Sequence, residues 1–356
     1  MATRTMERRR RRRRAVVAIG ITASLVTGVG YGTWRFIEER EYLLEERCEV
    51  TVGEEILELT PEQARNAALL SAAAVDRGLP PEAAVHAVGI SLQEEDLMLR
   101  EPTEEGGSPA LFARGAPSWS DSPDAQRSAV TVEGFYSALE ASWEEAQEAE
   151  EAADEEDEDA ESDEAAEDEE QPQHWDPQLP LDEAALALDR PYNPQFYPQH
   201  AARARAFARP LTGQQPVDMT CHLSQLDVSG PDPQGVASAL VEQLSSALEI
   251  PYTEEPEDDE ESDDDAEPEP ILDGVIETRG SGADAEVEVS VPAADGAYDY
   301  QWMVAHWAVA VARDYGIQTV DARTYRWDRD SARWSRNGAE QDTGSTTVVL
   351  GFSRES

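Results

Sequence analysis

Apolar residues recur at helical spacing in several segments of the first two thirds of the chain. Thr60-Pro61-Glu62-Gln63 provides a threonine N-cap, a proline at the first helical position and a glutamine three residues after the cap, so a helix is expected to begin here and to end at Gly78. A second helix is expected from Pro81 through the cluster Gln93-Glu94-Glu95. Three further segments share this periodicity: residues 130–143, a segment from Leu181 and one after Pro194.

Other segments alternate apolar and polar residues, as strands do. Residues 48–58 predict a short strand or hairpin. After Cys221 an amphipathic helix is expected over 236–248 and a strong helix over 299–315, ending at Gly316. A hairpin is expected between Trp327 and Trp334. The remaining predicted strands are residues 271–278, 285–291, 319–325 and 346–352. This order predicts a small α+β domain.

The N-terminus carries a membrane-targeting pattern. Residues 15–34 are uncharged and about long enough to cross a bilayer core. The unbroken arginine block Arg8–Arg14 precedes them, so residues 1–14 are expected in the cytoplasm, residues 35–47 as a stalk and the bulk of the chain outside the cell membrane. A cleaved signal peptide is the alternative, but Tyr31 and Trp34 stand where a small-residue cleavage site is needed.

Charge narrows the possible partners. The formal net charge is −48, and all 28 basic residues are arginine. So acidic a chain repels phosphates, which argues against nucleic-acid binding. Two acidic stretches, 144–174 and 253–270, are too charged to bury a core and are expected to be disordered insertions. The alternative is that they buffer divalent cations weakly, although they lack the turn residues of a tight Ca²⁺ site.

Two cysteines, Cys48 and Cys221, bound one long segment. Outside the membrane thiols oxidise, so a disulfide is expected between them, with two free thiols as the alternative. The histidines show no metal-ligand spacing, so neither a metal site nor a cofactor is predicted.

Several motifs together resemble a known family. They are Leu59-Thr60-Pro61-Glu62-Gln63-Ala64, Ser91-Leu92-Gln93-Glu94-Glu95, Ala110-Leu111-Phe112-Ala113-Arg114, Pro194-Gln195-Phe196-Tyr197-Pro198-Gln199-His200 and Met219-Thr220-Cys221. Their order resembles single-pass exported proteins of actinobacteria with a degenerate lytic-transglycosylase (lysozyme-like) domain, some of which are labelled "heavy metal transporter". The resemblance implies one lysozyme-like domain over residues 48–221, interrupted by the acidic insertion, and followed by the α+β domain at 222–356.

The resemblance places Glu94 at the position of a catalytic acid. A lytic transglycosylase needs one carboxyl group that protonates the glycosidic oxygen and then acts as a base. The accompanying loop departs from the family pattern, because Ala110 replaces glycine and Ala113-Arg114 replaces a glutamine pair. The loss of these loop residues argues against efficient catalysis. The alternative to a catalytic Glu94 is an exposed carboxylate at a helix end.

Aromatic and histidine side chains are further candidates for a sugar cleft. Tyr197 and His200 are three residues apart and could meet the cleft, or they could be a core residue and a solvated imidazole. Four tryptophans of the C-terminal part could stack on glycans, although packing inside the α+β domain is the simpler interpretation: Trp302, Trp307, Trp327 and Trp334.

The sequence therefore predicts a mainly α lysozyme-like domain and a small α+β domain behind one N-terminal transmembrane helix. The expected function is a non-catalytic, peptidoglycan-facing binding or scaffolding module of the cell envelope, anchored in the lipid bilayer. A weak muralytic enzyme that uses Glu94 is the first alternative, and cation buffering by the acidic tracts is the second.

Overall fold

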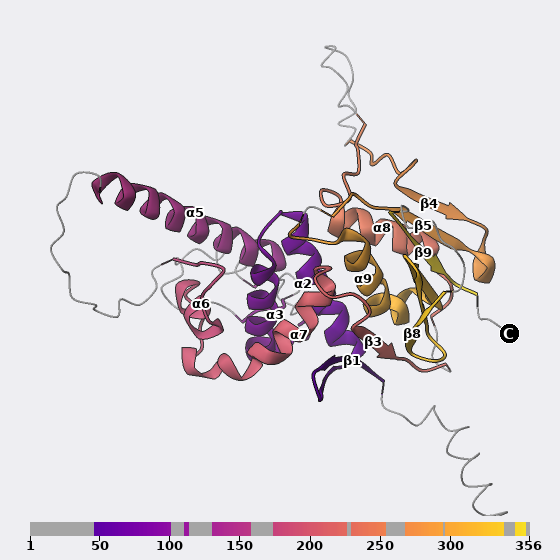
Figure 1. Ribbon diagram of the computed structural model, residues 1–356, viewed down its shortest axis with the longest axis horizontal. Helices are drawn as coiled ribbons and strands as arrows, with labels where there is room; N and C mark the ends of the chain where they lie inside the picture. The colour runs from indigo at the N-terminus through magenta and orange to yellow at the C-terminus, as the bar shows by residue number, and fades with distance from the viewer. Residues whose placement is uncertain are drawn as a thin grey trace, which may run out of the picture. The chain divides into compact units, whose positions relative to one another are not determined.

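The computed structural model describes residues 46–100, 110–113, 130–157, 174–225, 229–253, 268–294, 296–337 and 346–353. Glu46–Leu223 and Val228–Ser356 belong to one compact unit. The described residues form seven α-helices and nine strands in two antiparallel sheets, a mixed α/β architecture (Figure 1). The predicted basic segment, transmembrane helix and nearly all of the stalk lie outside these residues.

A three-stranded sheet joins the two ends of the helical region. β1 (Arg47–Val52) lies between β2 (Glu55–Leu59) and β3 (Met219–His222). Cys48 lies opposite Cys221 in the register of β1 and β3, with a Cα–Cα distance of 3.9 Å, and the two form the predicted disulfide. The expected pairing of these cysteines is therefore confirmed.

Two helices follow the sheet much as predicted. α2 (Pro61–Asp76) begins with a complete capping box, in which Thr60 Oγ1 accepts from the Gln63 amide and Gln63 Oε1 accepts from the Thr60 amide. α3 (Pro81–Glu95) ends at Asp96, whose left-handed backbone (φ 52°) turns the chain sharply. Buried side chains of α2 hold this turn: Gln63 Nε2 donates to the Asp96 carbonyl and Asn66 Nδ2 to the Leu97 carbonyl.

The helix near residue 130 is longer than predicted. α5 covers Val132–Asp157, so the first part of the acidic stretch at 144–174 is helical rather than disordered (Figure 1). The stretch consists mostly of glutamate and alanine here, which are strong helix formers, and the helix simply continues past its apolar part. The rest of this stretch, and most of 253–270, lies outside the described residues.

The chain then returns to α3 through short elements. α6 (Leu181–Ala187) is followed by two 3₁₀ turns, η2 (Pro194–Phe196) and η3 (Pro198–His200), and by α7 (Ala201–Leu211). The helix expected directly after Pro194 thus begins only at Ala201, because Pro198 has no amide hydrogen to continue a regular helical ladder.

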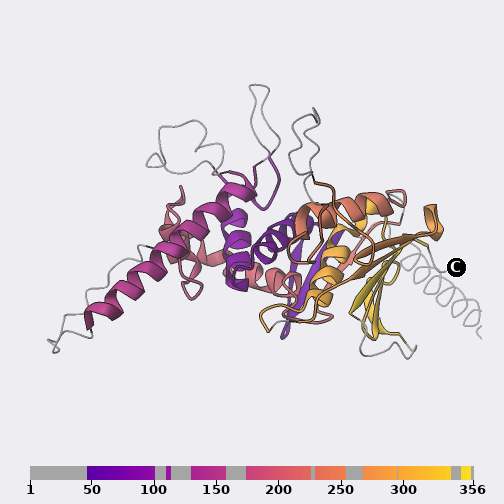
Figure 2. The same cartoon turned by 90° about the horizontal axis from the view of Figure 1, so that it is seen from above.

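The C-terminal part contributes a six-stranded antiparallel sheet in the order β4-β5-β9-β6-β7-β8. The strands are Ile276–Arg279, Glu286–Ser290, Thr347–Gly351, Thr319–Ala322, Tyr325–Asp328 and Arg333–Arg336, in that order, with the 3₁₀ turn η4 (Gly282–Asp284) between β4 and β5. Trp327 lies opposite Trp334 in the β7–β8 hairpin, as predicted. Two helices, α8 (Pro233–Leu244) and α9 (Tyr300–Tyr315), cover one face of the sheet (Figures 1 and 2).

α9 joins the two parts of the chain. It contacts α2 and α7 on one side and β6 and β9 on the other. All residues from Gln301 to Ala312 are buried, as expected for a helix that is apolar all round. The segments before and after Cys221 therefore share one hydrophobic core. Trp302, Trp307 and Trp327 lie inside this core and Trp334 is partly buried against it, which favours the packing interpretation of these rings.

Two buried histidines make the stability of this core depend on pH. His86 accepts from the Trp175 indole at Nδ1 (2.9 Å), so Nε2 carries the proton toward the Leu179 carbonyl (3.0 Å). His306 donates from Nδ1 to the Pro210 carbonyl (3.0 Å). Burial lowers the pKa of both imidazoles to about 4.

Because each histidine binds its proton more readily when unfolded, we expect stability to be fully present above pH 6.5 and to fall toward pH 4. The loss amounts to about 3 kcal/mol for each residue. Denaturant unfolding between pH 7 and pH 4 measures it, with His86→Gln and His306→Gln as comparisons. Each variant should flatten the pH dependence; a profile identical to the original chain would contradict the assignment.

Candidate functional site

The Glu94 carboxylate is enclosed by protein at the last turn of α3. Its side chain has no exposed surface. Oε1 accepts from Arg190 Nε (2.8 Å) and from the Tyr197 hydroxyl (3.1 Å), and Oε2 accepts from Arg190 Nη2 (2.5 Å) and the Ala113 amide (2.9 Å). All four partners are donors, so the carboxylate acts here only as an acceptor. The alternative of an exposed carboxylate at a helix end is wrong, because Arg190 compensates its burial.

Arg190 completes the site, and its setting is as closed as that of Glu94. Its guanidinium makes a two-pronged contact with the carboxylate and also donates to the Ala113 carbonyl (3.1 Å). It lies 5.4 Å from the centre of the Phe112 ring and 5.7 Å from that of Phe135, within range of cation–π attraction. These two rings stack on each other at 4.2 Å.

Local backbone geometry brings Arg190 to Glu94. After α6, Asp189 adopts a left-handed conformation (φ 47°), and the Arg190 amide returns to the Ala185 carbonyl (2.9 Å). α6 itself lies close to α3 at Gly89, where a Cβ atom would lie 2.6 Å from Leu181 Cδ2. A glycine in the middle of α3 is therefore explained by this close approach.

Loop 110–113 forms the third wall of the site. Ser91 Oγ donates to the Leu111 carbonyl (2.7 Å), and Ala110 pairs with Arg100 in an isolated bridge. The main chain of Ala113 thus provides both a donor to Glu94 and an acceptor to Arg190. Arg114, the last residue of this motif, lies outside the described part of the chain.

The two cleft candidates have different surroundings. Tyr197 is buried, and burial together with the Glu94 carboxylate raises its pKa. His200 is half-buried and contacts Gln93 Oε1 through Nε2 (3.2 Å), while burial and the charge of Arg203 lower its pKa. Tyr197 therefore joins Glu94, whereas His200 faces the neighbouring residue Gln93.

This arrangement lacks two requirements of a general acid. A catalytic carboxyl must reach the glycosidic oxygen and must have a proton to donate to it. No atom of the Glu94 side chain is exposed, and its carboxylate oxygens accept four hydrogen bonds from Arg190, Tyr197 and Ala113. Arg190, the residue most responsible for this closure, was not among the candidates from the sequence. Arg190 lies in a loop that has no hydrophobic periodicity. The only argument that could have identified it from the sequence is that a buried glutamate requires a cationic partner.

Two aromatic side chains are exposed beside the site. Tyr192 and Phe196 have 42% and 47% of their surface accessible. Both belong to the segment 191–200, in which η2 packs on α6 and η3 packs on α3. Carboxamides accompany them: Gln195 and Gln199 are exposed, and Gln199 Nε2 donates to Gln93 Oε1 (3.0 Å). The exposed aromatic rings near the predicted cleft are thus Tyr192 and Phe196 rather than the tryptophans.

The described residues hold no group of histidine, cysteine, aspartate or glutamate side chains that could bind a metal ion. Within the same ranges, no helix combines the length and the apolar character needed to cross a bilayer, and the predicted span at 15–34 lies outside them. No protein-family model matches the chain, and neither a curated protein nor a solved structure shows significant similarity to it.

Proposed function

We propose that the chain is a membrane-anchored protein of the cell envelope whose lysozyme-like helical region binds peptidoglycan glycan without cleaving it. The observation that carries the proposal is the enclosure of Glu94 by four hydrogen bonds, two of them from Arg190. Three of the five motifs that carry the resemblance, at 91–95, 110–113 and 194–200, contribute residues to the surroundings of Glu94. In this proposal Glu94 holds the position of the family's catalytic acid, and its burial removes the access of a substrate to it.

Export is supported by the disulfide. A bond between Cys48 and Cys221 is typical of proteins that fold outside the reducing cytosol. The arginine block and the apolar run at residues 8–34 indicate the same location, because they form the pattern of a membrane anchor with an exported C-terminal part.

Glycan binding is supported by the exposed segment 191–200. An aromatic ring offers an apolar face on which a sugar ring can stack, and a carboxamide can both donate to and accept from hydroxyl and N-acetyl groups. Tyr192, Phe196, Gln195 and Gln199 provide both kinds of group on the surface next to Glu94. The muralytic alternative would require Glu94 to leave Arg190 and to reach this surface.

Sedimentation with purified, insoluble peptidoglycan tests the proposal. The full-length chain should sediment with the wall at moderate salt, and Tyr192→Ala and Phe196→Ala should each weaken this about 2- to 10-fold, as expected for the loss of one aromatic contact. Tyr252→Ala is the matched control, because Tyr252 is equally exposed (43%) but lies far along the chain. Folded Glu94→Gln should still bind. A wild-type chain that stays in the supernatant, or equal losses for Tyr252→Ala, would refute the proposed surface.

A further inference from the structure

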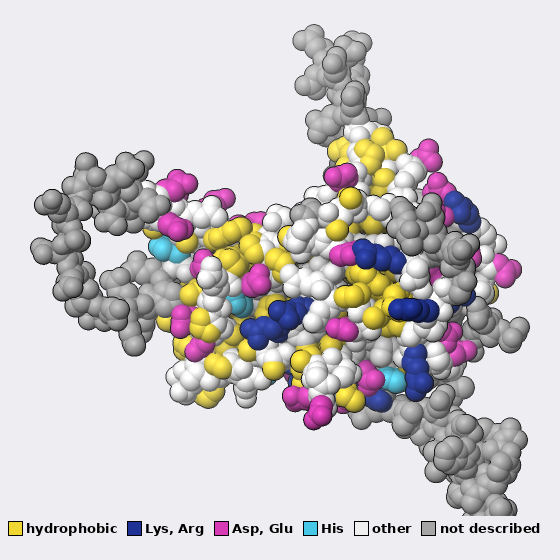
Figure 3. Space-filling model, in the orientation of Figure 1, with side chains coloured by type: hydrophobic (Ala, Val, Ile, Leu, Met, Phe, Trp, Pro, Cys, Tyr) yellow, Lys and Arg dark blue, Asp and Glu magenta, His cyan; other side chains and the backbone are white. Residues whose placement is uncertain are grey.

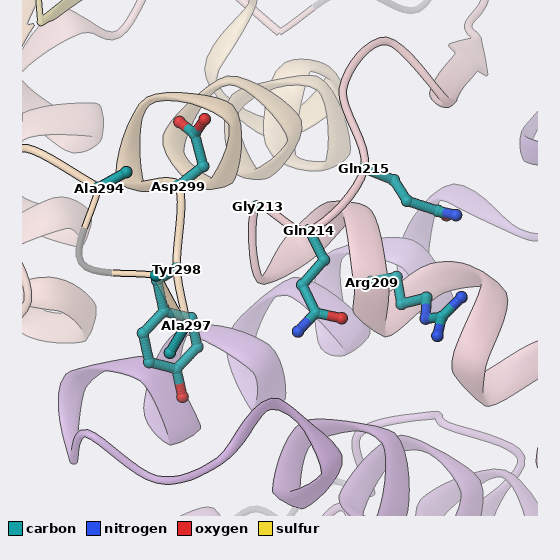
Figure 4. Close-up of a pocket in the computed structure, with 9 residues that line it drawn as sticks. Arg209, Gly213, Gln214, Gln215, Ala294, Ala297, Tyr298 and Asp299 are labelled. Atoms are coloured by element: carbon teal, nitrogen blue, oxygen red, sulfur yellow. The ribbon is translucent and has the colours of Figure 1, made fainter.

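A second candidate site lies in the same compact unit, where the end of α7 meets the start of α9. A pocket of about 490 Å³ is lined by Arg209, by the turn at residues 213–215, and by Ala294 and residues 296–299 (Figure 4). Its volume falls in the usual range for small-molecule sites. It is separate from the residues that surround Glu94.

The two walls of this pocket are fixed against each other. Gly213 has φ +75°, and a Cβ atom there would lie 2.1 Å from the Asp299 carbonyl oxygen, so only glycine allows this contact. The turn itself is closed by the Gln214 amide, which donates to the Arg209 carbonyl (2.8 Å). The pocket is therefore a built feature of the fold rather than a gap between loops.

Among the described residues that line the pocket, Arg209 is the charged side chain without an ion-pair partner. Asp299 is already engaged: Oδ1 accepts from the Trp302 amide (3.3 Å) and Oδ2 pairs with Arg323. Figure 4 shows its carboxylate pointing away from the side to which Gln214 and Tyr298 project. Arg209 is exposed and forms no ion pair with any described residue. Asp295, between Ala294 and Gly296, lies outside the described residues.

Two further arginines of α7, which do not line the pocket, also lack an ion-pair partner among the described residues. Arg205, one turn before Arg209 on α7, and Arg203 are exposed and likewise have no carboxylate partner within the described ranges. Figure 3 shows a group of arginine side chains in the region of α7. In a chain with a net charge of −48, these arginines are a local concentration of positive charge, although Asp176 and Asp96 lie within electrostatic range of the same histidines as Arg205 and Arg203.

We propose that this pocket binds the C-terminal carboxylate of a short peptide, with Arg209 as the carboxylate contact and Gln214 as a contact to the peptide amides. A guanidinium fork matches a carboxylate in geometry, and one unpaired cation matches its single charge better than that of a phosphate dianion. Carboxamides complement peptide groups because both donate and accept. The proposed function identifies the peptide: the ligand is the peptide stem of peptidoglycan. Only this choice of peptide rests on the proposed function.

Calorimetric titration of the full-length chain with N-acetyl-D-alanyl-D-alanine tests the inference at about 0.15 M salt, where the Debye length of about 8 Å screens distant carboxylates. Binding should weaken about 10- to 100-fold in Arg209→Gln, the loss expected for a charged hydrogen bond. It should be unchanged in Arg203→Gln, which alters an equally exposed arginine of the same helix. The C-terminal amide of the dipeptide should not bind.

Three results would overturn the inference: no binding of the dipeptide by the wild-type chain, equal binding of the amide, or full competition by inorganic phosphate. The outcome is separable from the proposed function. If the chain sediments with the wall through Tyr192 and Phe196 but does not bind the dipeptide, only the proposal for the pocket is refuted. If it binds the dipeptide but does not sediment with the wall, only the proposed glycan surface is refuted.

Discussion

Replacing Arg190 with alanine is expected to lower the free energy of unfolding by about 3–5 kcal/mol. The substitution leaves the Glu94 carboxylate buried without its cation and removes three hydrogen bonds and two ring contacts. Lysine is not expected to rescue the site, because an ammonium group cannot make the two-pronged contact. Denaturant unfolding monitored by tryptophan fluorescence measures the change.

Arg279→Ala is the matched control for this prediction. Arg279 also contacts two carboxylates, Glu277 and Glu288 at 2.7 Å each, but its side chain is 59% exposed. Its removal should leave the stability nearly unchanged. The double variant Glu94→Gln/Arg190→Met should recover much of the loss, because no charge is then left unpaired. If Arg190→Ala had as small an effect as Arg279→Ala, the buried ion pair would not exist in solution.

Removing the disulfide is the second large expected effect. The Cys48–Cys221 bond closes a loop of 173 residues, and the chain-entropy model credits such a cross-link with up to about 5 kcal/mol. The variant Cys48→Ala/Cys221→Ala should therefore unfold at a markedly lower denaturant concentration, with a loss of about 2–5 kcal/mol.

A comparison with the reduced chain separates the contribution of the cross-link to stability from that of cysteine side-chain packing. Both cysteines are fully buried, so the alanine variant also loses sulfur contacts. Wild-type protein unfolded in the presence of a thiol reductant lacks only the bond. It should lose most of the stability that the variant loses, whereas a chain insensitive to the reductant would show that the bond does not form.

Local sequence patterns were enough to predict many of the elements. The capping box at Thr60 marks the start of α2 because its hydrogen bonds join residues three apart. Trp327 and Trp334 pair across β7 and β8 because a short hairpin leaves few registers. The disulfide was predictable because only two cysteines are present and the N-terminal pattern predicts export.

The site itself could not be predicted from such patterns. Glu94 was found by resemblance, but its environment depends on Arg190, 96 residues later, and on Phe112 and Phe135. Whether a carboxylate at a helix end faces solvent or a buried guanidinium is a tertiary property that no local spacing encodes. The extension of α5 through Asp157 was missed for a different reason: high charge argues against a core, but not against a helix that runs beyond it.

We propose that Glu94 is a structural anion rather than a catalyst. Mass spectrometry of the soluble products after purified peptidoglycan is incubated with the full-length chain tests it most directly. We predict no anhydro-muropeptides above a protein-free blank, with a muramidase digest as positive control. Products that appear with the wild-type chain and disappear with folded Glu94→Gln would contradict the account.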